Sequence, residues 1–191
     1  MEGTKEMRVI DVGCGPGVWV EKLNQVDDIS AIGIDIDRSI PDKPWLHRVD
    51  VLSDKFDKYV DYDIALCFEV VEHLDPETSE LFIKKLCRTA PEIYFSAAVP
   101  GQVGLGHINC QPKEYWENIF NKNNYIYDPE TTEEFREFIM SKVWIDWMEK
   151  NVMVFKNYGS MYYDTIVEEE QDAAVHMAAY FEDKNGKSKR K

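Results

Sequence analysis

The stretch VIDVGCGPG, residues 9–17, decides the fold of this 191-residue chain. In it, an apolar run that contains Asp11 passes directly into the pattern Gly13-x-Gly15-x-Gly17. Glycines at this spacing let the backbone turn sharply and approach a ligand closely, and the start of a following helix offers unpaired N–H groups. The stretch therefore predicts a strand, a ligand-binding loop and a helix in succession.

Two features of this loop argue against a dinucleotide such as NAD. The dinucleotide fingerprint Gly-x-Gly-x-x-Gly requires a glycine at position 18, where this chain has Val18. The carboxylate of Asp11 would also repel a pyrophosphate, whereas it can pair with an amino or a sulfonium group. A ligand that carries positive charge near the loop is therefore favoured.

Short apolar runs that end in acidic or turn residues alternate with stretches of helical spacing. This alternation is typical of a parallel sheet with crossover helices, so the sequence predicts an α/β domain over residues 1–156. The expected strands are Met7–Val12, Ala31–Asp35, Leu46–Val51, Tyr62–Phe68, Ile93–Val99, Tyr125–Tyr127 and Val152–Phe155. The expected helices are Val18–Val26, Pro76–Arg88, Pro112–Lys122 and Thr132–Met148.

The helix at Pro76–Arg88 has the clearest signals. Asp75 is placed to cap it, because a carboxylate can accept from the free N–H groups of the first turn, and Pro76 suits the first helical position. Residues 157–191 are expected to form a further helix, Thr165–Phe181, and then a basic, disordered tail. In the helix at Pro76–Arg88, the stripe that faces the core is expected to consist of Leu81, Ile83, Leu86 and Cys87.

The composition limits the partners and the location of the protein. Its 22 Lys and Arg against 36 Asp and Glu give a net charge of −14, which repels a phosphate backbone and argues against DNA binding. No stretch reaches the ~18 uninterrupted apolar residues of a membrane span. The four cysteines are widely spaced, without a CxxC pair, as is typical of a reduced protein. The sequence therefore predicts a cytoplasmic protein that binds neither DNA nor membranes.

Residues 9–17 resemble the first motif of the class I S-adenosylmethionine-dependent methyltransferases, whose cofactor carries both an amino and a sulfonium group. The later motifs follow in order at Gly33-Ile34-Asp35-Ile36, at Asp50-Val51 and at Cys67-Phe68-Glu69-Val70. The resemblance implies a Rossmann-like, seven-stranded, mostly parallel sheet with helices on both faces. It also implies S-adenosylmethionine as the cofactor.

The same resemblance assigns the cofactor contacts. Asp35 is expected to accept hydrogen bonds from the ribose hydroxyls, and Ile36 is expected to pack on the adenine ring. Asp50 and the backbone of Val51 are expected at the adenine edge, and Glu69 near the reacting methyl group. For each acid the alternative is a helix cap or a turn residue. The predicted cofactor-binding set is Asp11, Gly13, Cys14, Gly15, Gly17, Asp35, Ile36, Asp50, Val51 and Glu69.

The string Glu69-Val70-Val71-Glu72-His73 and the later His107 carry the candidate chemistry. A helical turn that begins at Glu69 would place Glu72 and His73 one turn on, so that the three side chains face one point. The string resembles that of metal-dependent RNA 2′-O-methyltransferases and that of ubiquinone-pathway O-methyltransferases, but it also occurs in class I enzymes that bind no metal. The sequence predicts no metal; the alternative is a divalent ion at Glu69, Glu72, His73 and His107.

His107, Glu69 and His73 are the catalytic candidates. His107 follows Gly101–Gly106, a loop with three glycines that is expected to be mobile over the site, and it is the candidate general base; capping of the next helix is its alternative role. The predicted reaction is methyl transfer to an oxygen or nitrogen of a small molecule or glycan. The alternatives are metal-dependent 2′-O-methylation of an RNA 3′ end and a catalytically silent cofactor-binding subunit.

Only Met1–Glu6 precede the first expected strand, whereas class I enzymes usually carry one or two helices there. The cofactor site is therefore expected to be open unless the C-terminal helix, the Gly101–Gly106 loop or a second subunit covers it. A homodimer or a partner subunit over the site is the corresponding prediction.

Overall fold

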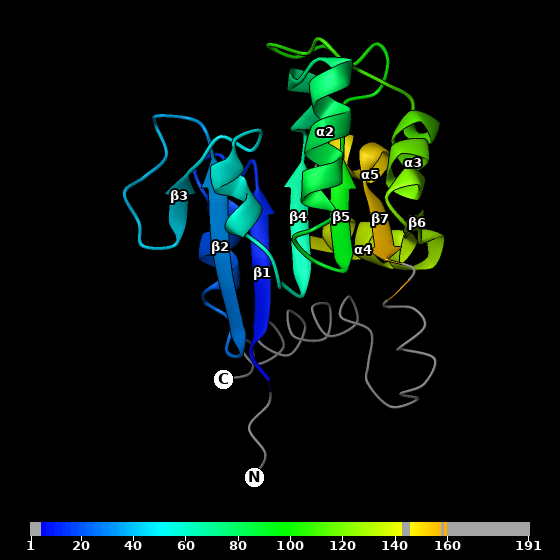
Figure 1. Cartoon of the computed structure of the whole chain (residues 1–191). Coiled ribbons are helices and arrows are strands. Elements are labelled where there is room, and N and C mark those ends of the chain that lie inside the picture. The colour runs from blue at the N-terminus through cyan, green and yellow to red at the C-terminus, as the bar shows by residue number, and fades with distance from the viewer. Residues whose placement is uncertain (1–4, 143–145, 158, 160–191) are drawn as a thin grey trace.

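The computed structural model describes residues 5–142, 146–157 and 159. The strands in this part of the chain are β1 (Met7–Val12), β2 (Ile29–Asp35), β3 (Leu46–Arg48), β4 (Ile64–Phe68), β5 (Glu92–Ser96), β6 (Tyr125–Tyr127) and β7 (Met153–Asn157). They form one sheet in the order β3-β2-β1-β4-β5-β7-β6 (Figure 1). β7 is antiparallel to both its neighbours, and the other pairs are parallel. The predicted seven-stranded, mostly parallel sheet is confirmed.

Helices cover both faces of this sheet. In Figure 1, α2 (Pro76–Leu86) and α3 (Lys113–Lys122) lie in front of the sheet, and α4 (Pro129–Lys142) and α5 (Asp146–Asn151) lie behind it. The other helical elements are α1 (Val18–Leu23) and two 3₁₀ turns, η1 (Asp54–Lys58) and η2 (Val71–His73). No helix of the described residues is long and apolar enough to cross a membrane.

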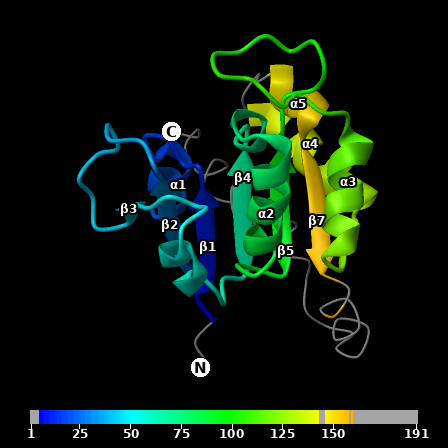
Figure 2. The ribbon, with the colours of Figure 1, turned by 45° about the horizontal axis from the view of Figure 1, so that its top comes forward.

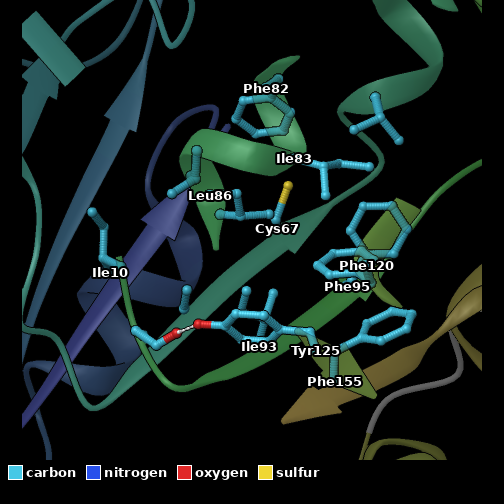
Figure 3. Close-up of a cluster of buried hydrophobic side chains, with 14 of the residues drawn as sticks. Ile10, Cys67, Phe82, Ile83, Leu86, Ile93, Phe95, Phe120, Tyr125 and Phe155 are labelled. Carbon is cyan, nitrogen blue, oxygen red and sulfur yellow. Dashed lines mark hydrogen bonds between the residues drawn. The ribbon is translucent and has the colours of Figure 1, made fainter. Parts of the chain in front are cut away.

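The larger hydrophobic core lies between the sheet and the helices α2 and α3 (Figure 3). Phe95 of β5 meets Phe120 of α3 edge to face, and Phe120 stacks on Phe155 of β7 with ring centroids 3.8 Å apart. A second buried cluster lies on the other face, with members from α1, α4 and α5. Burial on both faces explains why the strands read as nearly continuous apolar runs.

The first turn of α2 forms as its sequence predicts. Asp75 Oδ1 accepts from the N–H of Thr78 at 3.1 Å, and Pro76 occupies the first turn. The predicted core stripe is wrong at Leu81, which is 46% exposed, whereas Phe82 is fully buried. The helical period explains the difference, because Phe82 lies on the same face as the buried Leu86, four residues later.

Several other elements differ from their predicted bounds, and among them β5 ends at Ser96 rather than at Val99. The single helix expected over Thr132–Met148 is two helices, α4 and α5, and α4 already begins at Pro129 because Asp128 accepts from the N–H of Thr131 at 3.0 Å. β3 ends at Arg48, before a turn held by Asp50, and α1 ends at Leu23. The helix predicted at Thr165–Phe181 and the basic tail lie outside the described residues.

Candidate functional site

The carboxyl ends of the parallel strands bring the predicted site residues to one edge of the sheet. Asp11 and Gly13 lie at the end of β1, Asp35 ends β2, and Glu69 directly follows β4. The strand order reverses at β1, where β2 lies on one side and β4 on the other. Open α/β sheets bind ligands in the crevice beyond the strand ends at such a switch point.

Backbone hydrogen bonds hold the glycine loop against the end of β2. The N–H of Gly13 donates to Ile34 O at 2.7 Å, and the N–H of Gly17 donates to Cys14 O at 2.9 Å. Gly13 has a φ of +81°, and a Cβ at this position would lie 2.2 Å from Val70 Cγ2. Only glycine therefore fits at this position.

Asp35 is joined to the same loop. Its Oδ2 accepts from the N–H of Gly15 and its Oδ1 from the N–H of Asp37, both at 2.8 Å. Gly15 has a φ of +52°, and a Cβ there would meet no atom within 4 Å. Each carboxylate oxygen keeps lone-pair capacity beyond one bond. The Asp35 carboxylate, which can accept further hydrogen bonds, therefore lies beside the uncovered backbone of Gly15.

Asp11 is 2% exposed, and its Oδ2 has no hydrogen-bond partner among the described residues. Burial is the main cause that raises the pKa of Asp11 to about 7, and the nearby Asp35 carboxylate acts in the same direction. Burial, together with these two acids, raises the pKa of Cys14 to about 12. Cys14 is therefore a neutral thiol that packs behind the loop, while Asp11 is an acid that a nearby cation would ionise.

The residues predicted to contact adenine lie beyond β2 and β3. Ile36 is apolar and yet 62% exposed, directly after Asp35. Because β3 ends at Arg48, Asp50 and Val51 lie in the turn after it rather than in the strand. Asp50 Oδ1 accepts from the backbone N–H two residues later at 2.9 Å. Asp50 therefore stabilises a turn, which is the alternative role expected from the sequence.

The chain turns sharply at Glu69. This residue has a φ of +54°, in the left-handed region that non-glycine residues rarely adopt, and its N–H donates to Ser96 O at 3.1 Å. The helical turn predicted to begin at Glu69 is therefore wrong, and the 3₁₀ turn η2 starts two residues later. As a consequence, Glu69 is not part of the group that Glu72 and His73 form with His107.

Two amide side chains that sequence reasoning missed hold Glu69. Its Oε2 accepts from Gln102 Nε2 at 2.7 Å, and its Oε1 accepts from Asn151 Nδ2 at 3.3 Å. No local pattern indicates that Gln102 contacts Glu69. The signal for Asn151 is topological: it ends α5 just before the antiparallel β7, which begins at the edge where the parallel strands end.

Glu72, His73 and His107 come together at the same edge, with one ligand atom from each within 4.8 Å of the others. Glu72 is fully buried, and its Oε1 accepts from the N–H of Ala98 at 3.3 Å and lies 4.0 Å from His107 Nε2. Its Oε2 has no hydrogen-bond partner among the described residues. Burial is the main cause that raises the pKa of Glu72 to about 7.

Both histidine rings are held through Nδ1. His73 Nδ1 lies 3.2 Å from Gly106 O, and His107 Nδ1 lies 3.4 Å from Gln102 O. A carbonyl oxygen only accepts, so these contacts favour the tautomer of each neutral ring with the proton on Nδ1 and the lone pair on Nε2; the Cys110 thiol also lies 3.9 Å from His107 Nδ1. The two Nε2 atoms are therefore available as a base or as metal ligands.

The loop after β5 covers this group. Figure 2 shows the loop, in green, at the end of the sheet to which the arrow of β4 points. A Cβ at Gly104 would lie 2.2 Å from His107 Nε2, so only a glycine lets the loop pass this close to the ring. Val103 and Leu105 are both 98% exposed at the outer side of the loop.

Comparison with known proteins supports a single family. Residues 2–95 match a family model described as a methyltransferase domain. Over 181 residues the chain is 23% identical to the ubiquinone biosynthesis O-methyltransferase of Proteus mirabilis, in an alignment that covers 87% of this chain and 69% of the relative.

Solved structures show the same fold. A SAM-dependent methyltransferase from Archaeoglobus fulgidus superposes with a TM-score of 0.58 at 18% identity, over 79% of this chain and 86% of that one. The small RNA methyltransferase HEN1 superposes with a TM-score of 0.59 at 16% identity, over 81% of this chain and 23% of that one. The family model, the named relatives and the fold agree. Residues 2–95 match the methyltransferase domain family, and the chain has the fold of S-adenosylmethionine-dependent methyltransferases.

Proposed function

We propose that this chain transfers the methyl group of S-adenosylmethionine to an oxygen or nitrogen of a small-molecule or glycan acceptor, with His107 as the general base. The orientation of His107 carries the proposal. Its Nδ1 faces Gln102 O, and its Nε2 keeps a lone pair 4.0 Å from Glu72 Oε1. A base must present an unprotonated nitrogen toward the acceptor, and with its proton on Nδ1 the ring would have Nε2 for this role, at the edge where the cofactor loop lies.

The residues around the glycine loop fit the cofactor. Asp11 has an unpartnered carboxylate oxygen that can pair with the amino group of the methionine portion. The remaining lone pairs of Asp35 can accept from ribose hydroxyls, and the open face at Gly15 leaves room for close approach. Ile36 offers exposed apolar surface for the adenine ring. Cys14, Gly17, Asp50 and Val51 complete the proposed cofactor site.

Binding of S-adenosylhomocysteine is expected to strengthen as the pH rises through 7. The amino group of this ligand is a cation, so binding favours ionised Asp11, whose pKa in the free protein is raised to about 7. Affinity should therefore be about tenfold weaker at pH 6 than at pH 8, and binding should release a proton. Calorimetry at both pH values measures the affinities, and buffers of different ionisation enthalpy measure the proton release. The Asp11→Asn variant should lose this dependence, and an unchanged slope in that variant would contradict the assignment.

The proposed chemistry needs little more than positioning and one proton acceptor. S-adenosylmethionine supplies the activated methyl group, and its sulfur keeps the electron pair of the broken C–S bond. His107 Nε2 takes the proton that the acceptor loses as the acceptor lone pair forms the new bond to carbon. The imidazolium that results lies beside Glu72, whose negative form stabilises it. His73, whose ring lies edge to face with that of His107 at a centroid distance of 5.1 Å, has the proposed role of orienting the acceptor.

Oxygen is the better-supported acceptor atom. The named relatives are O-methyltransferases, and a neutral hydroxyl needs a base such as His107 more than most nitrogen nucleophiles do. The net charge of −14 opposes binding of a polyanion and supports a small molecule or glycan. The test is label transfer from methyl-labelled S-adenosylmethionine to panels of phenols, sugars, RNA ends and proteins. Transfer only to RNA would overturn the proposed acceptor class, and no transfer to any panel would support a silent cofactor-binding subunit.

One observation favours a second function, metal-dependent 2′-O-methylation of an RNA 3′ end. The cluster of Glu72, His73 and His107 offers two imidazole nitrogens and a carboxylate, a ligand set suited to several divalent ions. Hydrogen bonds from each Nδ1 to a carbonyl are the usual outer-shell support of metal-bound histidines. Against this function, the amides of Gln102 and Asn151 engage Glu69, so three ligands remain rather than four.

Metal dependence separates the two functions. We expect turnover on a small-molecule acceptor to survive treatment with EDTA, because His107 acts as a base without a metal. The measurement is the rate of label transfer before and after chelation, and after addition of Mg²⁺ or Mn²⁺. A loss on chelation that Mn²⁺ restores would favour the metal enzyme, above all if His73→Ala removed the Mn²⁺ dependence.

Three further assignments belong to this proposal. Residues 1–156, together with Asn157 at the end of β7, form the methyltransferase domain. A homodimer or a partner subunit covers the cofactor site, in support of which Val18 and Ile36 are 60% and 62% exposed near the glycine loop. The location is the cytoplasm, supported by four unpaired cysteines.

A further inference from the structure

A chain of amide groups connects the start of β7 to the loop over the site. Asn151 is the last residue of α5 and is 1% exposed. Its Nδ2 donates to Gln102 Oε1 at 2.8 Å and to Glu69 Oε1 at 3.3 Å, and Gln102 Nε2 donates to Glu69 Oε2 at 2.7 Å. The three side chains come from segments 33 to 82 residues apart in the sequence.

The direction of each bond follows from chemistry. The carboxylate of Glu69 can only accept, so Gln102 must turn its NH₂ group toward it. The side-chain oxygen Oε1 of Gln102 then faces Asn151, which donates a hydrogen bond to it from its own NH₂ group. One orientation of each amide therefore makes all three hydrogen bonds, and the donor and acceptor of each bond are fixed.

Gln102 also holds the candidate base. Its backbone carbonyl accepts from His107 Nδ1 at 3.4 Å, while its side chain bonds to Glu69 and Asn151. Its side-chain oxygen accepts in addition from the N–H of Val99 at 3.4 Å, which closes the start of the loop. Gln102 therefore contacts Glu69 through its side chain and His107 through its backbone, and the Cys110 thiol lies 3.9 Å from the same His107 Nδ1.

The fold alone does not explain an asparagine at position 151. Asn151 Oδ1 is buried without a hydrogen-bond partner among the described residues. A buried acceptor that lacks a partner destabilises a protein, and an apolar side chain of similar size would avoid this loss. The gain from the amide lies in its two donated bonds, and both of them point to residues of the site.

We propose that Asn151 is a positioning residue for methyl transfer, which acts through Gln102 on Glu69 and His107. The amide fixes Gln102, and Gln102 holds the loop so that His107 keeps its proton on Nδ1 and its lone pair on Nε2. The consequence for catalysis rests on the proposed function, because it requires His107 to be the base.

The tautomer of His107 tests this proposal without an acceptor. Spectra of ¹⁵N-labelled histidine in the full chain, with saturating S-adenosylhomocysteine at pH 8, distinguish the two neutral tautomers, and the His107→Ala variant assigns the signal. We expect the ratio of the Nδ1–H to the Nε2–H form to fall about fivefold in Asn151→Leu, the weight of one ordinary hydrogen bond. Gln102→Leu changes a residue on a partly exposed loop and should give the same shift in the tautomer ratio. This variant tests the proposal if Asn151→Leu does not fold.

The matched control is Asn24→Leu, which removes an amide that bonds to both the N–H and the C=O of Ala31, away from the site. It should lower the melting temperature and leave His107 unchanged. An unchanged tautomer ratio in Gln102→Leu, and in Asn151→Leu if that variant folds, would overturn the proposal. If the ratio shifts as expected while His107→Ala retains full turnover, the positioning stands and the proposed base is wrong.

Discussion

We expect His107→Ala to lower methyl transfer by about 10²–10⁴-fold, the usual contribution of a general base. The reason is the geometry of the ring, whose Nε2 is unprotonated and lies beside Glu72 under the loop after β5. Affinity for S-adenosylhomocysteine should stay within about twofold, because the proposed role of His107 is toward the acceptor rather than toward the cofactor. Initial rates of label transfer and calorimetry on the same preparation measure the two effects.

His47→Ala is the matched control. His47 is also half-buried, and its ring contacts Tyr59 beyond β3 rather than the site. This variant should retain turnover. A higher pH should partly restore His107→Ala, because an ionised acceptor needs no base. If Mn²⁺ restores it instead, His107 is a metal ligand, and if only the melting temperature falls, His107 has a structural role.

Asp35→Ala should weaken binding of S-adenosylhomocysteine by about 1–3 kcal/mol, which is roughly 5- to 150-fold. The variant removes the proposed acceptor for the ribose hydroxyls. It also removes the partner of the Gly15 N–H, so that the loop loses one of its ties to β2. Both losses act on the same ligand, and calorimetric titration at pH 8 measures their sum.

The neighbouring Asp37 provides the control for this experiment. Asp37 Oδ1 accepts from the N–H of Ser39 at 2.7 Å, in the segment after β2, and it has no proposed contact with the cofactor. Asp37→Ala should leave the affinity unchanged within about twofold. Equal affinities for the Asp35→Ala variant and the parent would show that another acid holds the ribose.

The fold was predictable because its signals are local and repeated. Alternating apolar runs and helical stretches indicate a parallel sheet, and the glycines at 13, 15 and 17 mark the turn from β1 to α1. The errors lie where side-chain interactions set an element's end. Asp128 starts α4 three residues before its predicted start, and the turn at Asp50 ends β3 before Val51.

The candidate site was predictable where it follows strand ends and unpredictable where it depends on long-range contacts. Asp11, Asp35 and Glu69 follow from the rule that parallel strands present their carboxyl ends at one edge. The prediction of a helical turn at Glu69 was wrong because β4 leads into Glu69 itself, which has a left-handed backbone conformation. The N–H of Glu69 donates a hydrogen bond to Ser96 of β5. Gln102 and Asn151 meet Glu69 only after the whole sheet has formed, so no local pattern indicates them.

Calorimetric titration of the full chain with S-adenosylhomocysteine, and separately with NAD, tests the central claim most directly. The claim is that the glycine loop, with Asp11 and Asp35, holds the cofactor at the edge of the sheet beside His107. The predicted result is binding of S-adenosylhomocysteine in the micromolar range, roughly −8 kcal/mol, and no measurable binding of NAD. Tighter binding of NAD, or no heat with S-adenosylhomocysteine at pH 8, would contradict the account.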